Sequence, residues 1–176
     1  MFSSRITDDV HELIGPYIKQ GDRAIDLTVG NGHDTLFLAK AVGKSGHVIG
    51  IDIQALAINQ AKRVIESENL ENVTLYLDDH ANITNYIEKP INVAMMNLGY
   101  LPKSDKKVIT KKETTIKAID QTLKMMDRKG IMSITVYIGH EGSQDEYEAV
   151  RDYLKILDSS VFQVREITYH NRENQP

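Results

Sequence analysis

The chain has no cysteine among its 176 residues. This absence excludes disulfide bonds, thiolate metal sites and thiol nucleophiles together, and we expect no bound metal. The chain also has no long apolar run and no signal-peptide pattern, because its amino terminus mixes charged and apolar residues. A formal net charge of −4 argues against a protein that binds nucleic acid over its whole surface, although a local basic patch is compatible with it. We therefore expect a cytoplasmic protein without membrane contact.

Length and hydrophobic content predict a single domain over residues 1–176, because 176 residues with 41% hydrophobic content suffice for one ordinary core but not for two. Runs rich in β-branched residues alternate with helical patterns, and no repeat or linker interrupts them. This alternation predicts an α/β fold with a mostly parallel central sheet and helices on both faces. Strands are expected near residues 23–28, 47–52, 73–77, 91–96, 131–137 and 161–169.

Helical patterns fill the segments between these strands. A helix is expected over about residues 34–42, and two further helices are indicated by apolar stripes, Leu56, Ala57, Ala61, Val64 and Ile65 in one and Ile116, Ile119, Leu123 and Met126 in the other. A later helix is expected to begin at Ser143, whose side chain would form a capping box with Glu146.

The end of the chain leaves the last strand open. The final strand candidate, residues 162–169, is followed only by a polar tail that ends in Pro176. Either one more strand is missing, or the sheet ends here with an exposed edge. Two copies could pair through such an edge or through an apolar helix face, so a homodimer is left open.

A glycine loop follows the first expected strand, in the run Asp26-Leu27-Thr28-Val29-Gly30-Asn31-Gly32. Its glycines would let the backbone approach a ligand, and the amino end of the next helix would offer unpaired N–H groups. A tight turn without a ligand is the alternative. Position 35 is Thr where a dinucleotide site has a third glycine, and Asp26 would repel a pyrophosphate but hold a cationic amino acid. The loop therefore favours S-adenosylmethionine over a dinucleotide.

Further polar residues follow the expected strand ends. Asp52 is placed to accept hydrogen bonds from ribose hydroxyls, and it could also cap the helix that begins near Gln54. The turn at Asp79 and His80 could reach the adenine amino group, with Ile53 or Ile83 over the ring, or it could be a solvated turn. The expected cofactor-binding residues are Asp26, Thr28, Gly30, Asn31, Gly32, Asp34, Thr35, Asp52, Gln54, Asp79 and His80, of which Asn31, Asp34 and Thr35 could instead cap a helix.

The stretch Asn97-Leu98-Gly99-Tyr100 follows the fourth expected strand. An amine that attacks a methyl group needs oxygen acceptors that align its lone pair, and the Asn97 side-chain carbonyl is one, while Tyr100 offers a ring for stacking a base. The spacing is that of the Asn-Pro-Pro-Tyr loop of amino-group methyltransferases, although both prolines are replaced. Methylation at a pyrimidine ring carbon commonly needs a cysteine, so the sequence favours transfer to an amine nitrogen or an activated oxygen. Asn97 and Tyr100 are the candidate catalytic residues.

A lysine cluster lies directly beyond this stretch, with Lys103, Lys106, Lys107, Lys111 and Lys112. Such a patch on an acidic protein would attract a phosphate backbone, and a solvated loop is the alternative. His140 follows the fifth expected strand at the same rim of the sheet, where it could touch substrate or be polar surface. Lys103, Lys106, Lys107 and His140 are the candidate substrate-binding residues.

These residues resemble the MnmM (YtqB-like) family of tRNA wobble-uridine methyltransferases, formerly described as rRNA methylases. The matching stretches are DLTVGNGHDTLFLA, GIDIQ, the DDH turn, NLGYLP, Tyr137 with GHEG at residues 139–142, and Asn171-Arg172. The resemblance implies a Rossmann-like class I methyltransferase that uses S-adenosylmethionine and binds a tRNA anticodon stem-loop. It would convert the 5-aminomethyl group of a wobble uridine, usually a 2-thiouridine, to 5-methylaminomethyl. By position, the family's cofactor contacts would fall on Asn31, Asp34, Thr35, Asp52, Gln54, Asp79 and His80, with Asn97 and Tyr100 facing the base.

Three other functions are compatible with parts of the sequence. Methylation of an amino group in rRNA or another RNA would use the same site. A nicotinamide-dependent oxidoreductase shares the glycine loop and the ribose acid but needs the third glycine. An RNA-binding module with a vestigial cofactor pocket would keep the lysine cluster without catalysis.

Overall fold

The computed structural model describes residues 5–88, 90–99, 110–138 and 142–170. Its sheet has five strands, β1 (Arg23–Asp26), β2 (His47–Asp52), β3 (Val73–Leu77), β4 (Ile91–Leu98) and β5 (Met126–Val136). The α-helices are α1 (Ile6–Ile14), α2 (His33–Val42), α3 (Ala55–Ser67), α4 (Lys112–Met125) and α5 (Ser143–Lys155), and two short 3-10 helices are η1 (Gly15–Tyr17) and η2 (His80–Asn85). No helix in these ranges is long and apolar enough to cross a membrane.

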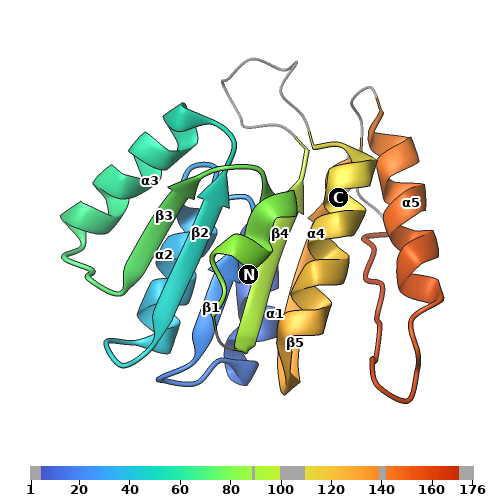
Figure 1. Cartoon of the computed structure of the whole chain (residues 1–176), viewed down its shortest axis with the longest axis horizontal. Coiled ribbons are helices and arrows are strands. Elements are labelled where there is room, and N and C mark those ends of the chain that lie inside the picture. Colours follow the sequence, from blue (N-terminus) through green and yellow to red (C-terminus); the bar gives the residue numbers. More distant parts are fainter. Residues whose placement is uncertain (1–4, 89, 100–109, 139–141, 171–176) are drawn as a thin grey trace.

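The strands lie in the order β3-β2-β1-β4-β5, and all four neighbouring pairs are parallel. The chain builds one half of the sheet outward from β1 to β3 and then returns to the other side of β1 with β4 (Figure 1). Asp26, at the end of β1, is in register with Gly50 on β2 and Met95 on β4. In open parallel sheets, ligands bind beyond the carboxyl ends of the strands where the strand order reverses. Here that place lies above β1 and β4.

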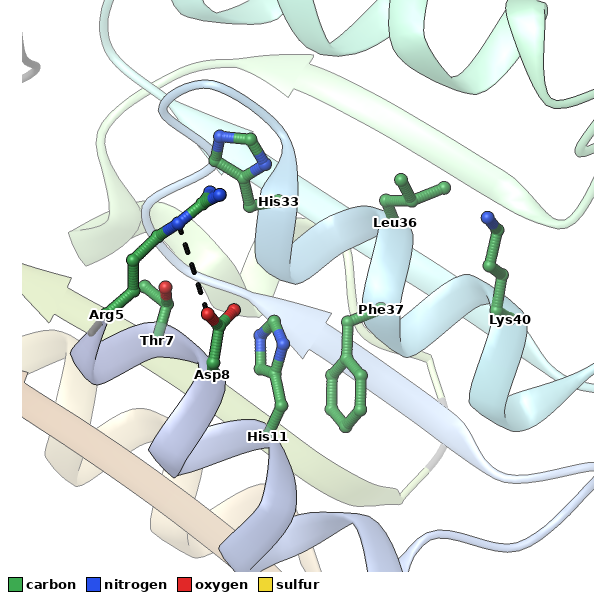
Figure 2. A pocket seen from close by; sticks show the side chains of 8 residues that line it. All are labelled: Arg5, Thr7, Asp8, His11, His33, Leu36, Phe37 and Lys40. Atoms are coloured by element: carbon green, nitrogen blue, oxygen red, sulfur yellow. Dashed lines mark ion pairs between the residues drawn. The ribbon is translucent and has the colours of Figure 1, made fainter. Parts of the chain in front are cut away.

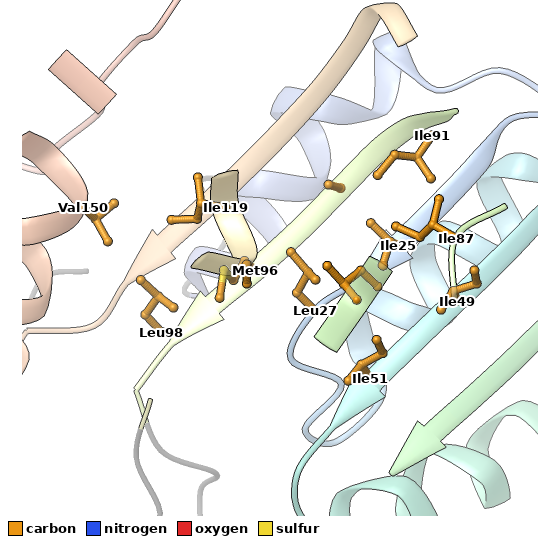
Figure 3. Packing of buried hydrophobic residues seen from close by; sticks show 13 residues of the cluster. Ile25, Leu27, Ile49, Ile51, Ile87, Ile91, Met96, Leu98, Ile119 and Val150 are labelled. Atoms are coloured by element: carbon orange, nitrogen blue, oxygen red, sulfur yellow. The ribbon is translucent and has the colours of Figure 1, made fainter. Parts of the chain in front are cut away.

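Helices cover both faces of the sheet, as predicted. On one face, Ile14 of α1 and Leu38 of α2 pack with Val48 and Val93 of the strands, and α3 adds Ala61 and Ile65 beside Val29. On the other face, η2, α4 and α5 cover the strands, and Figure 3 shows Ile119 and Val150 from the two α-helices beside Met96 and Leu98 of β4. Burial on both faces explains why the central strands are nearly continuous apolar runs.

The predicted strands agree with the structure except at the end of the chain. The strands over residues 47–52 and 73–77 are confirmed residue for residue, whereas β1 ends at Asp26, β4 runs on to Leu98 and β5 begins earlier, at Met126. Helix α1 and η2 were not predicted.

The strand predicted over residues 161–169 is wrong, because the structure forms no strand there. Val161, Val164 and Ile167 are exposed, and the segment is held by side chains, with the Tyr169 hydroxyl donating to Asp9 at 2.6 Å and the Tyr147 hydroxyl donating to Glu166 at 2.6 Å. Strand propensity describes how well side chains fit a paired, half-buried surface, and it does not supply the partner strand.

The capping box predicted at Ser143 is also wrong. The residue that caps α5 is Gly142, no side chain makes the cap hydrogen bond, and the Glu146 side chain points to other partners. Its carboxylate accepts hydrogen bonds from the hydroxyls of Thr110 at 2.6 Å and Thr115 at 2.7 Å. Glu146 is buried, and these bonds join α5 to α4 at Thr115 and to the chain just before α4 at Thr110, rather than closing a helix end.

Candidate functional site

The loop after β1 lies at the carboxyl edge of the sheet and is tied to both neighbouring strands. Its backbone continues the sheet hydrogen bonding, with the Leu27 N–H donating to the Met95 carbonyl at 2.9 Å and the Val29 N–H donating to the Ile51 carbonyl at 3.1 Å. The glycine at position 32 then turns the chain into α2 with a left-handed φ of 80°. No side chain caps α2, so the first N–H groups of this helix face the edge of the sheet where the strand order reverses.

Gly32 also lies against α3, which gives a first prediction. A Cβ at Gly32 would lie 3.0 Å from both Cα and Cβ of Ala61, while a Cβ at Gly142, with the same φ of 80°, would meet nothing within 4 Å. Left-handed backbone costs a residue with a Cβ about 1–2 kcal/mol. Gly142→Ala should lose about that much unfolding free energy in urea, and Gly32→Ala about 1–3 kcal/mol more from overpacking. Equal losses in the two variants would contradict the close packing of the loop on α3.

Asp52, at the end of β2, orders the loop through both of its carboxylate oxygens. One oxygen accepts from the Gly30 N–H at 2.8 Å, and the other accepts from the Gln54 N–H at 2.9 Å, at the start of α3. Burial raises the pKa of the Asp52 carboxyl, while the Gly30 and Gln54 hydrogen bonds lower it. Asp52 therefore fixes the glycine loop and the following turn together, and oxygen lone pairs remain for a ribose hydroxyl.

Asp26 lies beneath the loop rather than at its mouth. The side chain is fully buried, and its oxygens accept hydrogen bonds from the Thr28 N–H at 3.1 Å and the Thr35 hydroxyl at 2.6 Å. Burial, reinforced by the charge of Asp34, raises its pKa to about 7. The direct contact between Asp26 and a cationic amino acid that the sequence suggested is therefore not formed by a side chain at the surface of the loop, because this carboxyl is buried beneath it. Thr35 supports Asp26 and does not cap α2.

The raised pKa of Asp26 has a measurable consequence. The folded state keeps a proton on this carboxyl that the unfolded chain releases, so unfolding free energy falls as the pH rises from 3.8 to about 7 and then levels off. Relative to Asp26→Asn, which cannot titrate, the wild type should lose on the order of 2 kcal/mol between pH 5 and pH 8 in urea unfolding. Parallel curves for the two proteins would contradict the assigned protonation.

Asp34 joins the first turn of α2 to two other elements. It is only 4% exposed. One oxygen lies 2.6 Å from the Nε2 of His11 on α1, and the other accepts a hydrogen bond from the Asn97 side-chain amide at the end of β4. The backbone N–H of Asn97 donates to the Thr28 hydroxyl at 2.7 Å. Asn97 is thus held from two sides, directly beside the glycine loop.

The ends of β2 and β3 carry apolar side chains that face solvent. Ile53 is 60% exposed and Leu77 is 58% exposed, whereas Ile83, the other predicted cover for an adenine ring, is buried in the core. Asp79 begins η2 by accepting from the Ala81 N–H at 2.8 Å. Exposed branched side chains on adjacent strand ends suit the faces of a flat aromatic ring.

His80 is the first residue of η2, which follows β3 and packs against α4 and β2. The His80 side chain is 11% exposed, and its Nε2, which is buried and has no hydrogen-bond partner, lies 3.9 Å from a carboxylate oxygen of Asp79. Burial lowers the pKa of the ring, and the charges of Asp79, Glu146 and Asp52 raise it in part. A buried nitrogen without a partner on this edge suits a ligand hydrogen bond.

A match to a known protein family over most of the chain decides to which family the chain belongs. The family described as "Putative rRNA methylase" matches residues 48–176. The chain belongs to this family. A second match, to protein-L-isoaspartate (D-aspartate) O-methyltransferase, covers residues 3–88.

Three relatives of this chain support its place in the rRNA methylase family. A chloroplastic tRNA (mnm(5)s(2)U34)-methyltransferase of Arabidopsis thaliana is 34% identical over 85% of this chain, and the chain spans 58% of the length of that relative. A crystal structure from Clostridium thermocellum, also described as an rRNA methylase, is 37% identical to this chain. Its TM-score is 0.95, and the match covers 100% of this chain and 95% of that one. A methyltransferase structure from Streptococcus mutans, in complex with SAH, is 34% identical with a TM-score of 0.86 over 99% of this chain and 95% of that one. The predicted resemblance and the class I methyltransferase fold are confirmed.

The cofactor predicted from the sequence, S-adenosylmethionine, agrees with this family and fold. The residues present also fit it. The uncapped amino end of α2 suits the carboxylate of an amino acid, Asp52 suits the ribose, and Ile53 with Leu77 suits the adenine ring. The Nε2 of His80, which has no hydrogen-bond partner, suits a polar contact with the ligand on the same edge.

The structure brings most of the predicted site residues to this edge. The residues that gather there are Asp26, Thr28, Gly30, Asn31, Gly32, Asp34, Thr35, Asp52, Gln54, Asp79, His80 and Asn97. Tyr100, Lys103, Lys106, Lys107 and His140 lie outside the described residues.

The sequence analysis gave no site role to four residues near this edge. His11 contacts Asp34, and the charge of Asp34 together with burial raises the pKa of Tyr137, which follows β5. Glu146 holds the Thr110 hydroxyl, which accepts from the Gly99 N–H at 3.1 Å, while the Thr110 N–H donates to the Gly99 carbonyl at 3.2 Å. Gly99 and Thr110, which flank the segment that carries Tyr100 and the candidate lysines, are therefore joined by hydrogen bonds, and Thr110 is also bonded to α5.

Proposed function

We propose that this chain is an S-adenosylmethionine-dependent tRNA N-methyltransferase. Its substrate is the 5-aminomethyl group of uridine or 2-thiouridine at the wobble position, and its product is 5-methylaminomethyl-(2-thio)uridine. The observation that carries the proposal is Asn97, which is held beside the glycine loop because its side-chain amide donates to Asp34 and its backbone N–H donates to the Thr28 hydroxyl. The name of the plant relative, a tRNA (mnm(5)s(2)U34)-methyltransferase, supports the choice of substrate.

The proposed chemistry is methyl transfer to nitrogen. When bound, the cofactor would supply a methyl group on a sulfonium, whose sulfur leaves as a neutral thioether when the carbon–sulfur bond breaks. Asn97 accepts a hydrogen bond from the substrate amine through its side-chain oxygen, so that the nitrogen lone pair points at the methyl carbon. Water accepts the proton that the amine loses. The chain has no cysteine to add to a pyrimidine ring, which agrees with an exocyclic nitrogen as the acceptor.

The proposed partner is the anticodon stem-loop of a tRNA. Lys103, Lys106 and Lys107 would meet its phosphates, while Tyr100 and His140 would contact the wobble nucleotide. The hydrogen bonds from Gly99 to Thr110 and from Thr110 to Glu146 support this assignment, because they fix the two residues that flank the lysine-bearing segment near Asn97. A single folded domain that works in the cytoplasm agrees with this role and stays a prediction.

The proposal is tested by transferring methyl groups in solution. Purified protein is incubated with S-adenosylmethionine and tRNA that carries 5-aminomethyluridine, and the digested nucleosides are measured by mass spectrometry. The expected product gains one methyl group at the wobble position, while rRNA and tRNA without the aminomethyl group stay unmodified. Methylation of rRNA instead would replace the substrate, and no methylation of either RNA would overturn the enzymatic proposal.

A further inference from the structure

His11, on α1, reaches the carboxyl edge of the sheet through its contact with Asp34. Its Nε2 lies 2.6 Å from Asp34, and its ring stacks on Phe37 of α2 with ring centres 3.9 Å apart and an angle of 4° between the planes. Figure 2 shows the two rings side by side between α1 and α2. Because a carboxylate oxygen can only accept, the Nε2 nitrogen is the donor in this contact. The ring is therefore held in one orientation by a stack and a hydrogen bond.

Asp34 passes this constraint to Asn97. A buried carboxylate needs donors to offset its lost hydration, and Asp34 has one on each oxygen, from His11 and from the Asn97 amide. Rotating the Asn97 amide by half a turn would place its oxygen against the Asp34 carboxylate, where two acceptors repel. The amide nitrogen is thus turned toward Asp34, and the amide oxygen is turned away from it.

We propose that His11 is a positioning residue, which acts through Asp34 to keep the Asn97 side-chain oxygen facing the acceptor amine. This inference rests on the proposed function and adds a residue outside the glycine loop to it. Without the His11 donor, Asp34 has a free oxygen in a buried position, and its carboxylate can rotate to draw both oxygens toward Asn97 or water. The Asn97 oxygen then samples orientations that do not align the amine.

The structure separates this role from a purely structural one. Helix α1 is also anchored by Ile14, which is buried in the core, by Val10 beside it, and by the Asp9 contact with Tyr169. Removing the imidazole therefore leaves the main packing of α1 in place. A positioning role predicts a loss of turnover, whereas a structural role predicts a loss of stability that turnover merely follows.

Three variants of His11 test the proposal. A glutamine side chain can place its amide nitrogen near the position of Nε2, whereas the shorter asparagine places its nitrogen near Nδ1 and does not reach Asp34. We expect His11→Ala and His11→Asn to lower kcat by about 10- to 100-fold, with KM for tRNA and Kd for S-adenosylmethionine changed less than about threefold. His11→Gln should recover most of the lost kcat. Urea midpoints measured alongside show whether any loss follows unfolding.

A second readout needs no substrate. The Asn97 side-chain amide is assigned in an NMR spectrum of the cofactor-free protein as the cross-peak pair that Asn97→Asp removes. Its bonded proton should resonate far downfield in the wild type and in His11→Gln, and should move toward the ordinary range in His11→Ala. An unmoved amide signal, or equal kcat losses in the glutamine and alanine variants, would overturn the positioning role. If the wild type methylates no RNA while the amide signal behaves as expected, the proposed function fails and the positioning of Asn97 stands.

Discussion

Replacement of Asp52 by alanine is expected to weaken the binding of S-adenosylmethionine by at least about 100-fold, which corresponds to about 2.7 kcal/mol. The carboxylate is the shared acceptor for the Gly30 N–H at 2.8 Å and the Gln54 N–H at 2.9 Å. Its loss leaves two backbone donors of a partly buried loop without a partner, and each such donor costs about 1–3 kcal/mol. The ligand also loses the proposed acceptor for its ribose hydroxyls. Isothermal titration calorimetry measures the change directly.

The matched control for this experiment is Glu66→Ala. Glu66 is an exposed carboxylate on α3, where it lies 4.0 Å from Lys62, so its removal changes the charge by the same amount. Such surface ion pairs contribute little, and binding should stay within about twofold. Asp52→Asn should fall between the two, because its amide can accept only one of the two backbone hydrogen bonds. Binding by Asp52→Ala within threefold of the wild type, with an intact urea midpoint, would refute the role given to this residue.

Most of the fold could be predicted, because its strands and helices follow from patterns in short stretches of sequence. Parallel strands buried on both faces are apolar runs, and those at 47–52 and 73–77 could be located to the residue. The failure at residues 161–169 has the opposite cause, since that segment has the composition of a strand but pairs with none of the five strands. Pairing depends on where other strands lie, and local composition does not report it.

The candidate site could also be predicted only in part. Asp52 and the glycine loop follow from their places at strand ends, whereas the partners of Asp34 do not. His11 lies 23 positions before Asp34 along the chain, and Asn97 lies 63 positions after it. Glu146 was misinterpreted because its spacing from Ser143 fits a local cap, while its actual partners, Thr110 and Thr115, lie on the far side of β5 in sequence. Buried polar side chains find partners through the fold, so their roles need the structure.

Replacement of Asn97 by alanine should have the second large effect, a fall in kcat of about 100-fold with little change in Kd for S-adenosylmethionine. An oriented hydrogen bond to a reacting group contributes about this much, because a misaligned lone pair no longer points along the line of transfer. The backbone N–H of Asn97 still donates to Thr28 in the variant, so the glycine loop keeps its support. Loss of turnover without loss of binding separates a catalytic side chain from one that shapes the cofactor site. Single-turnover methyl transfer to tRNA bearing 5-aminomethyluridine provides the rate.

Asn92→Ala is the control on the same strand. Asn92 lies near the opposite end of β4, where its side-chain oxygen accepts from the Arg23 N–H at 3.0 Å. Its removal costs the hydrogen bond from the Arg23 N–H and leaves the carboxyl edge untouched, so turnover should stay within about twofold while the urea midpoint falls. Asn97→Asp provides a further distinction, because a carboxylate beside Asp34 is repelled by it, and one of the pair should bind a proton. Turnover in that variant should therefore fall as in Asn97→Ala, and wild-type rates in either Asn97 variant would remove this side chain from the mechanism.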